Sequence, residues 1–317
     1  MKLSVAMAVY NGEKYLEEQL ESILNQSMPV DEVVIVIDGS HDGSEAIVDR
    51  FSQKCGIIKK VVNEANLGYR KSFARALENT IGDIVFLCDQ DDRWHKNKVE
   101  VMVNTLKEDE SISVLASSFS FMNADSQVYQ VRQLPHRSNN NLYTKEVAKG
   151  ALVPVTFEEF RQNNYFQGCA LALRRGAVED YLAHFSDDLT HDWLINLLAS
   201  KKNGVRFLNV PLFDYRIHGS NAIGVPGASN RNADIRLDVV KNGWAVNKFI
   251  RETWPDYAAA HPECEGLEKL CEEHYEALKD GKVWTVIKEN ANPYYRQFKA
   301  FPARMKDIWY ACRRKKR

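Results

Sequence analysis

Three carboxylates stand together in LCDQDDRWHKNK, the stretch from Leu87 to Lys98. Asp89, Asp91 and Asp92 come directly after an apolar run, where neighbouring like charges raise each other's pKa unless something neutralises them. Asp89 and Asp91, two residues apart at a strand end, can both face one hard cation, and Mg²⁺ and Mn²⁺ prefer oxygen ligands. The alternative is a solvated acidic turn, which is favourable near the N-terminus of the next helix. The position after a buried strand favours the cation.

A second acidic segment, DGSHDGS, begins at Asp38 and also follows an apolar run. A carboxylate there can accept hydrogen bonds from a nucleobase or a ribose hydroxyl, and the N–H groups at the start of the following helix can bind an anion. Asp, Gly and Ser serve ordinary turns and helix N-caps equally well. The residues alone leave both interpretations open.

His191 and Asp192 open the apolar-periodic segment HDWLINLLAS. Asp192 is either the N-cap of a helix or a general base that projects from the helix start into a cleft, where a carboxylate suits a hydroxyl nucleophile. His218 lies in YRIHGSN, after the last apolar strand. Its imidazole would complete a metal shell, contact a phosphate, or serve only the structure. Spacing alone does not separate these alternatives.

The elements that position these residues alternate along the chain. Buried strands are predicted for LSVAMAV, EVVIVID, IIKKVV and DIVFLC, with segments of helical spacing between them. Such alternation implies right-handed crossovers and a mainly parallel sheet flanked by helices, an α/β fold. In these sheets ligands bind beyond the carboxyl ends of the strands. The polar turns YNG, DGSHDGS, NEANLGYRK and DQDD all fall there, so the sequence predicts one site along this edge.

The second half of the chain is less regular. Residues 124–165 lack a clear period and contain Pro135 and Pro154, which predicts a long loop over the site. Strands are predicted again in ISVLASSFSF, CALALRR and VRFLNVPLFDYRIH, and a helix in THDWLINLLASKK. After the Gly-rich HGSNAIGVPGAS the pattern becomes helical. We therefore expect a main domain over residues 1–225 and a C-terminal helical region over 226–317.

Composition excludes several classes of protein. With 44% hydrophobic and 27% charged residues, the 317-residue chain is an ordinary globular protein, and its net charge of −1 gives no argument for nucleic-acid binding. Its six cysteines form no CxxC pair, which predicts reduced thiols in a cytosolic protein without zinc or disulfides. The apolar start meets no cleavage site, and no run approaches the ~20 apolar residues of a membrane span. We expect a soluble or peripheral protein.

The terminal segment NPYYRQFKAFPARMKDIWYACRRKKR has apolar residues at steps of three and four and ends in five basic residues. One interpretation is a helix packed on the main domain with a solvated basic tail. The other is an interfacial helix with Trp309 and Tyr310 at the level of anionic lipid headgroups. Pro302 interrupts the run.

Six segments in this order resemble the family 2 glycosyltransferases, inverting enzymes with the GT-A fold. They cover roughly the first 225 residues, and the forms DQDDRW, HDW and YRxHxxN look most like bacterial enzymes of surface polysaccharide synthesis, rhamnosyltransferase-like members included. The matching segments are VAMAVYNGEKYLEEQLESILNQS, DEVVIVIDGSHDGS, NEANLGYRKSFARAL, GDIVFLCDQDDRW, HDWLINLLA and PLFDYRIHGSNAIG.

The resemblance implies a role for each matching residue. Asp192 would be the catalytic base. Asp89 and Asp91 would hold the metal, with Asp91 the closer ligand and His218 a third ligand or a phosphate contact. The donor would be bound by Val9, Tyr10, Asn11, Asp38, Gly68, Arg70, Lys71 and Asp89. The acceptor side would include Gly168, Cys169, His191 and Trp193.

The implied reaction moves a sugar from a nucleotide-diphosphate donor, with Mg²⁺ or Mn²⁺, to a hydroxyl of a saccharide or polyprenyl-linked acceptor. Such an enzyme would be cytoplasmic, at the inner face of the cell membrane if the C-terminal segment contacts lipid. Three positions depart from the family's pattern. Many members have two aspartates where this chain has Ile37-Asp38, Thr is common in place of His41, and Asn often follows the Arg where Ala76 stands.

Two alternatives stay open from the residues. A phosphotransferase with an aspartyl nucleophile also uses DxD after a strand, but it would carry the motif on an early strand with Thr or Val where Arg93 stands. A non-catalytic protein that binds sugar nucleotides would share every motif. Neither sugar, base nor acceptor can be predicted from one chain.

Overall fold

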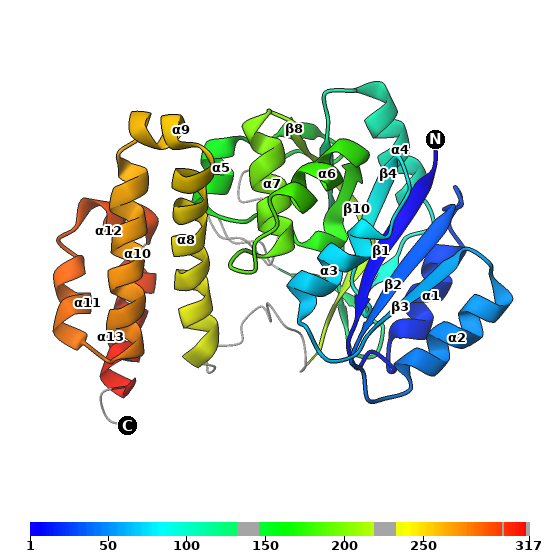
Figure 1. Ribbon diagram of the computed structural model, residues 1–317, viewed down its shortest axis with the longest axis horizontal. Helices are drawn as coiled ribbons and strands as arrows, with labels where there is room; N and C mark the ends of the chain where they lie inside the picture. The colour runs from blue at the N-terminus through cyan, green and yellow to red at the C-terminus, as the bar shows by residue number, and fades with distance from the viewer. Residues whose placement is uncertain (132–145, 219–232, 300, 315–317) are drawn as a thin grey trace. The chain divides into compact units, whose positions relative to one another are not determined.

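The structure, a computed structural model, describes residues 1–131, 146–218, 233–299 and 301–314 (Figure 1). The chain divides into two compact units. Unit 1 comprises Met1–Phe160 and Asn164–Pro226, and unit 2 comprises Arg161–Asn163 and Gly227–Arg317.

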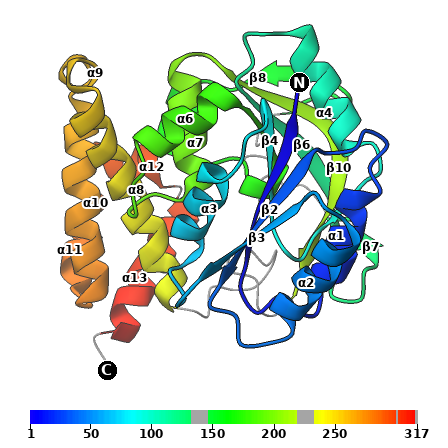
Figure 2. The same ribbon diagram turned by 45° about the vertical axis from the view of Figure 1, so that its right-hand side comes forward.

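Unit 1 begins with four parallel strands in the spatial order β3-β2-β1-β4. The largely buried sequences of β1, β2 and β4 suit a sheet covered on both faces, and α3 lies on the opposite face from α1 and α2 (Figure 2). The predicted α/β alternation is confirmed. The elements are β1 (Leu3–Val9), α1 (Leu16–Leu24), β2 (Glu32–Asp38), α2 (Ser44–Lys54), β3 (Ile58–Asn63), α3 (Tyr69–Glu78), β4 (Ile84–Cys88) and α4 (Lys98–Glu108).

The other half of the sheet is mixed. β9 (Leu171–Arg174) runs antiparallel between β4 and β6 (Val114–Asn123). The long strand β10 (Val205–Ile217) is parallel to β6, and the register shifts on either side of Pro211. β5 (Arg93–Trp94) pairs antiparallel with the end of β10. This pairing brings the segment that follows the three carboxylates beside the strand that His218 directly follows.

The described parts of the predicted long loop over residues 124–165 are mostly irregular and contain three short elements. β7 (Val128–Tyr129) pairs with β6, and β8 (Leu152–Pro154) pairs with β10. α5 (Phe157–Gln162) follows. These elements are too short to show a period in the sequence. The middle of the predicted loop, residues 132–145, lies outside the described residues.

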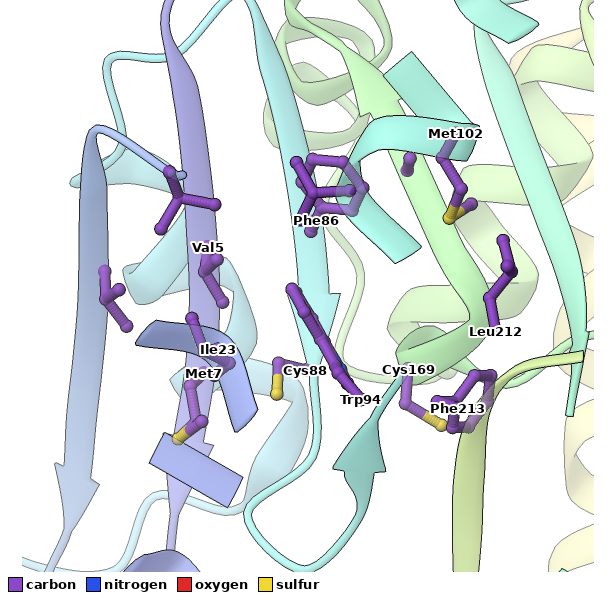
Figure 3. Packing of buried hydrophobic residues seen from close by; sticks show 14 of the residues in the cluster. Val5, Met7, Ile23, Phe86, Cys88, Trp94, Met102, Cys169, Leu212 and Phe213 are labelled. Atoms are coloured by element: carbon purple, nitrogen blue, oxygen red, sulfur yellow. The ribbon is translucent and has the colours of Figure 1, made fainter. Parts of the chain in front are cut away.

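The remaining helices of unit 1 are the one-turn η1 (Gly168–Ala170), α6 (Arg175–Ala183) and α7 (His191–Lys201). The core packs β1 and β4 against α1 and α4 through side chains such as Met7, Ile23, Phe86 and Met102 (Figure 3). All five residues of β4 are buried. A core side chain of this size contributes about 1.5–3 kcal/mol on burial, so the strand that ends at Asp89 is firmly held.

Unit 2 is helical. Its small core joins α8, α10, α11 and α13 through Val240, Leu278, Val286 and Tyr310. Within the described residues no helix is both long enough and apolar enough to cross a membrane. The helices are α8 (Ala233–Thr253), α9 (Pro255–Ala260), α10 (Glu263–Lys279), α11 (Val283–Glu289), α12 (Pro293–Phe298) and α13 (Phe301–Arg314).

The terminal segment forms two helices. Pro302 lies in the first turn of α13, where proline is tolerated because the first N–H groups have no partner within the helix. The apolar run that the sequence predicted Pro302 to interrupt is divided here between α12 and α13. Tyr310, which the interfacial interpretation placed among lipid headgroups, is only 7% exposed.

Candidate active site

A pocket of about 800 Å³ opens where β1, β2 and β4 end. The start of α7 and the residue after β10 complete its wall. Of the predicted site residues, eleven line it: Val9, Tyr10, Asn11, Asp38, Gly68, Asp89, Asp91, Gly168, His191, Asp192 and His218. The strand-edge site expected from the polar turns is thus present as a single cavity.

Four predicted residues are not among those that line the pocket. The Lys71 ammonium pairs with Asp187 at 3.0 Å, and the indole N–H of Trp193 donates to the Phe160 carbonyl at 2.7 Å. Cys169 is fully buried. The Arg70 guanidinium lies over the ring of Tyr69, a lining residue, at 5.0 Å from its centre.

Asp91 and His218 face each other in the pocket. Nε2 of His218 lies 2.7 Å from Oδ2 of Asp91, and the two side chains are 13% and 15% exposed. A carboxylate oxygen and an imidazole nitrogen at this separation are donors that Mn²⁺ accepts, and the carboxylate alone suits Mg²⁺. Asp91 therefore fits the role of a metal ligand predicted from the DxD spacing.

A second group of donor atoms lies beneath the pocket. One ligand atom each of Asp89, Asp92 and Cys169 falls within 4.8 Å of the others. A buried sulfur favours softer metals than Mg²⁺, and neither Asp92 nor Cys169 lines the pocket. Asp89, Asp91 and His218 all line the cavity. We therefore favour these three residues, rather than the group with Cys169, as the ligands of a cation that contacts a molecule bound in the pocket.

Two neighbouring carboxylates, Asp89 in the pocket wall and Asp92 buried beneath it, have perturbed protonation. Burial, followed by the charge of Asp91, raises the pKa of Asp89 to about 7. The same two causes raise the pKa of Asp92 well above its usual range. Burial lowers the pKa of nearby Lys98 to about 8, and its ammonium donates to the Cys169 carbonyl at 2.7 Å. A bound cation at Asp89 and Asp91 would favour their ionised forms.

Arg216 fixes the acidic loop from below, a role that the sequence did not reveal. Its side chain is fully buried. Its backbone N–H donates to Asp92 at 3.0 Å, and its Nε donates to the Asp91 carbonyl at 2.6 Å. The guanidinium also pairs with Glu18 at 2.5 Å. The available signal was its place two residues before His218 in YRIH.

Gln90, the middle residue of the DxD motif, joins two strand ends. Its side-chain oxygen accepts from the Tyr10 N–H at 2.8 Å, and its amide N–H donates to the Tyr10 carbonyl at 3.1 Å. Asp38 likewise holds the loop before α3, because it accepts from the N–H groups of Leu67 and Gly68 at 2.8 and 2.9 Å. A carboxylate has about four acceptor positions, so Asp38 still has capacity for a ligand.

Asp192 belongs to the first turn of α7, and Thr190 occupies the N-cap position. Asp192 is therefore not an N-cap residue, which was the structural alternative from the sequence. Its carboxylate is 6% exposed and lines the pocket. Its charge contributes to the raised pKa of Asp89. The predicted base and the predicted metal ligands thus influence each other electrostatically in one cavity.

His191 borders the same wall with both ring nitrogens unpartnered within the described part of the chain. Its ring stacks on Phe73 at 4.0 Å between centres, and burial lowers its pKa. A Cβ added at Gly168 would overlap its Nε2. The glycine therefore makes room for a neutral imidazole that faces the pocket.

The chain matches the family model described as glycosyl transferase family 2 over residues 4–182. It belongs to this family. A curated relative, the dTDP-rhamnosyl transferase RfbG of Shigella flexneri, is 25% identical over 256 residues, which are 75% of this chain and 80% of the relative. Two further curated glycosyltransferases match at 29% and 25% identity, and the chain spans 46% and 62% of their length.

Solved structures of the family's fold also match. The S. aureus TarS fragment 1–349 in complex with UDP-GlcNAc gives a TM-score of 0.58 at 19% identity, covering 98% of this chain and 89% of that one. The mannosyltransferase PcManGT of Pyrobaculum calidifontis, in complex with GDP-Man and Mn²⁺, gives 0.51 at 16% identity, covering 98% and 85%. Both likenesses concern the fold, and they confirm the GT-A architecture expected from the motifs.

Proposed function

We propose that residues 1–225 form an inverting, metal-dependent glycosyltransferase that moves a sugar from a nucleotide-diphosphate donor to a hydroxyl group. The observation that carries the proposal is that Asp91, with His218 beside it, and Asp192 line one pocket. Its volume of about 800 Å³ lies within the range of ligand sites, roughly 300–1,000 Å³. The two roles come from different elements. The metal ligands Asp91 and His218 follow the ends of strands, and the base Asp192 lies in the first turn of α7.

In the proposed reaction a new bond forms between the acceptor oxygen and C1 of the sugar while the bond from C1 to the diphosphate oxygen breaks. Attack comes from the face opposite the leaving group, so the configuration at C1 inverts. Asp192 takes the proton of the acceptor hydroxyl. A cation held by Asp89, Asp91 and His218 would stabilise the negative charge that develops on the diphosphate.

The other pocket residues orient the substrates. The two hydrogen bonds between the Gln90 side chain and the Tyr10 backbone fix the turn after β1, and we place the nucleotide against this turn. Phe73 and His191 form an apolar, stacked wall beside Asp192, which limits water near the base and so opposes hydrolysis of the donor. Gly168 and His191 border the side that we assign to the acceptor.

We propose a saccharide or a polyprenyl-linked saccharide of bacterial surface polysaccharide synthesis as the acceptor, with the protein acting in the cytoplasm, at the inner face of the membrane. The similarity to RfbG, a dTDP-rhamnosyl transferase, supports deoxyhexose donors such as dTDP-rhamnose among the candidates. The complexes of TarS with UDP-GlcNAc and of PcManGT with GDP-Man and Mn²⁺ support the donor class and the metal.

The proposal is tested by thermal stabilisation against UDP-, dTDP- and GDP-sugars, with and without Mn²⁺, because a ligand that binds only the native state raises the unfolding temperature. We expect one donor to stabilise the protein in a metal-dependent way and to be transferred to added saccharide acceptors, or slowly hydrolysed without them. Binding without transfer or hydrolysis would indicate a non-catalytic sugar-nucleotide protein. Phosphate release from generic esters would indicate a phosphotransferase.

A further inference from the structure

Unit 2 exposes an unusual share of large apolar side chains on two helices. Five of the fourteen exposed large hydrophobic residues in the described chain lie on α11 and α13. Trp284 is 73% exposed, Phe301 63% and Trp309 53%, and Ile287 and Met305 are exposed to a lesser degree. Single exposed apolar residues are ordinary, but a cluster marks an interaction surface.

α13 has a buried face and an exposed apolar face. The buried face packs inward through Asp307, Tyr310 and Ala311. The other carries Phe301, Met305, Trp309 and Cys312 at steps of four, four and three, so that these side chains lie on one side of the helix. All four are exposed. A helix that served only the core of unit 2 would present polar residues on this outer side.

Basic side chains flank the outer face. Lys288, Lys306 and Arg313 are exposed, and the Arg313 guanidinium lies over the Trp309 ring at 4.0 Å from its centre. Residues 281–314 contain eight Lys and Arg but only two acidic residues, Glu289 and Asp307. Both acids are buried. The charge that this part of the chain presents to solvent is therefore positive.

The neighbouring helix α10 has the opposite character. It carries six glutamates and two lysines in 17 residues. Unit 2 thus has one acidic helix, α10, and one basic, aromatic face built from α11 and α13. Exposed aromatic residues scattered at random would not gather on the basic helices alone. We call the basic, aromatic set the α13 face: Trp284, Ile287, Lys288, Phe301, Arg304, Met305, Lys306, Trp309 and Arg313.

The α13 face is hollowed by a groove of about 480 Å³ with Ile287, Phe301 and Met305 among its lining. Arg296 and Arg304 also line it, and both donate to Asn290, at 2.7 and 3.1 Å. Nε of Arg304 is buried and has no hydrogen-bond partner within the described residues. A groove with an apolar lining and guanidinium groups beside it matches an acyl chain below a phosphate group.

We propose that the α13 face binds a membrane surface that contains anionic phospholipid, with Phe301, Met305 and Trp309 at the level of the headgroups and Lys306 and Arg313 at the phosphates. Amphipathic aromatic rings and basic flanks are the features by which a helix lies in the membrane interface without crossing it. The inference concerns lipid binding and does not depend on the proposed sugar transfer.

The test uses the full chain and vesicles of phosphatidylcholine, alone or mixed with phosphatidylglycerol. We expect flotation with the mixed vesicles and a blue shift of tryptophan emission. Lys306→Glu combined with Arg313→Glu lowers partitioning to the mixed vesicles at least about tenfold, because each basic residue near an anionic surface adds severalfold to binding. Phe301→Ala combined with Trp309→Ala lowers it and abolishes the blue shift contributed by Trp309.

The matched control is Lys269→Glu combined with Lys279→Glu, which makes the same change of charge on α10, where both lysines are exposed. It keeps wild-type partitioning, and circular dichroism establishes that all variants are folded. The proposal is overturned if the wild type does not bind mixed vesicles, if both double charge reversals reduce binding equally, or if sedimentation shows a dimer that Phe301→Ala with Trp309→Ala dissociates. The last result would assign the face to a second copy of the chain.

Discussion

Asp307 in unit 2 and Asp92 beneath the pocket are both fully buried aspartates, yet their surroundings differ. Asp307 accepts from the Tyr295 hydroxyl at 2.9 Å and from the Lys299 ammonium at 2.8 Å, and Nε2 of His274 lies 3.3 Å away. Asp92 accepts from the backbone N–H of Arg216 and lies beside the Cys169 thiol, and its Oδ2 has no hydrogen-bond partner within the described residues.

The difference in hydrogen-bond partners indicates different roles for the two buried aspartates. A buried carboxylate that meets cations and hydroxyls is part of the packing of its unit, whereas one left short of partners is destabilising unless something else requires it. His191, with two unpartnered nitrogens, belongs to the second kind. Around the pocket the chain keeps polar groups available at the expense of stability, a common property of functional sites.

The largest effect on stability is expected at Asp307. Asp307→Asn leaves Lys299 without its carboxylate in a buried site, while His274 keeps its pair with Glu289, and breaking such a buried pair costs about 3–5 kcal/mol. The unfolding temperature falls by several degrees in thermal denaturation followed by circular dichroism. An unfolding temperature equal to that of the wild type would show that the network contributes nothing, and the comparison with Asp92 would fail.

Asp91→Ala removes the predicted ligand beside His218. Because changing even an outer neighbour of a metal ligand lowers affinity about 10–100-fold, we expect loss of at least about 100-fold in Mn²⁺-dependent binding of a nucleoside diphosphate by calorimetry, with little change in thermal stability. Asp256→Ala, at an exposed position on α9, is the control and keeps wild-type binding. Metal-dependent binding that survives Asp91→Ala would remove Asp91 from the ligand set.

A smaller loss is expected from Gly168→Ala. The added methyl group displaces the His191 ring from its place against the pocket, and misplacing a substrate contact by about 1 Å can lower turnover up to 100-fold. We expect roughly a tenfold loss of turnover with donor binding preserved. Gly176→Ala, where a Cβ meets nothing within 4 Å, is the matched control. Equal activity of both variants would show that the position of His191 is unimportant.

The smallest effect is a gain. Burial and the charges of Asp91 and Asp89 raise the pKa of Asp92, so the native state favours the protonated carboxyl while the unfolded chain is ionised above a pH of about 4. The free energy of unfolding therefore falls as the pH rises from about 4 towards the raised pKa of Asp92. Asp92→Asn, whose side-chain oxygen can still accept from Arg216, escapes this loss and gains about 1 kcal/mol at neutral pH. A gain that is equal at pH 4 and pH 8 would contradict the cause.

The sequence predicts the site better than the strands around it. The polar turns after β1, β2 and β4 meet because parallel strands end at one edge, and this follows from alternation alone. The antiparallel direction of β9 does not follow from it, because this strand has four residues, three of them buried, and carries no signal of direction. The roles of Arg216 and Lys98 depend on contacts between segments more than 70 residues apart, which no local pattern contains.

The central claim is that a cation at Asp91, which stabilises the donor diphosphate, and a base at Asp192, which deprotonates the acceptor, serve one sugar transfer in one pocket. It is tested most directly with Asp192→Asn, by measuring Mn²⁺-dependent nucleoside diphosphate binding and sugar transfer on the same preparation. The account predicts binding within about twofold of wild type and a loss of transfer in the range of about 10²–10⁴ that general-base removal produces. Transfer near the wild-type rate, or loss of binding together with transfer, would contradict it.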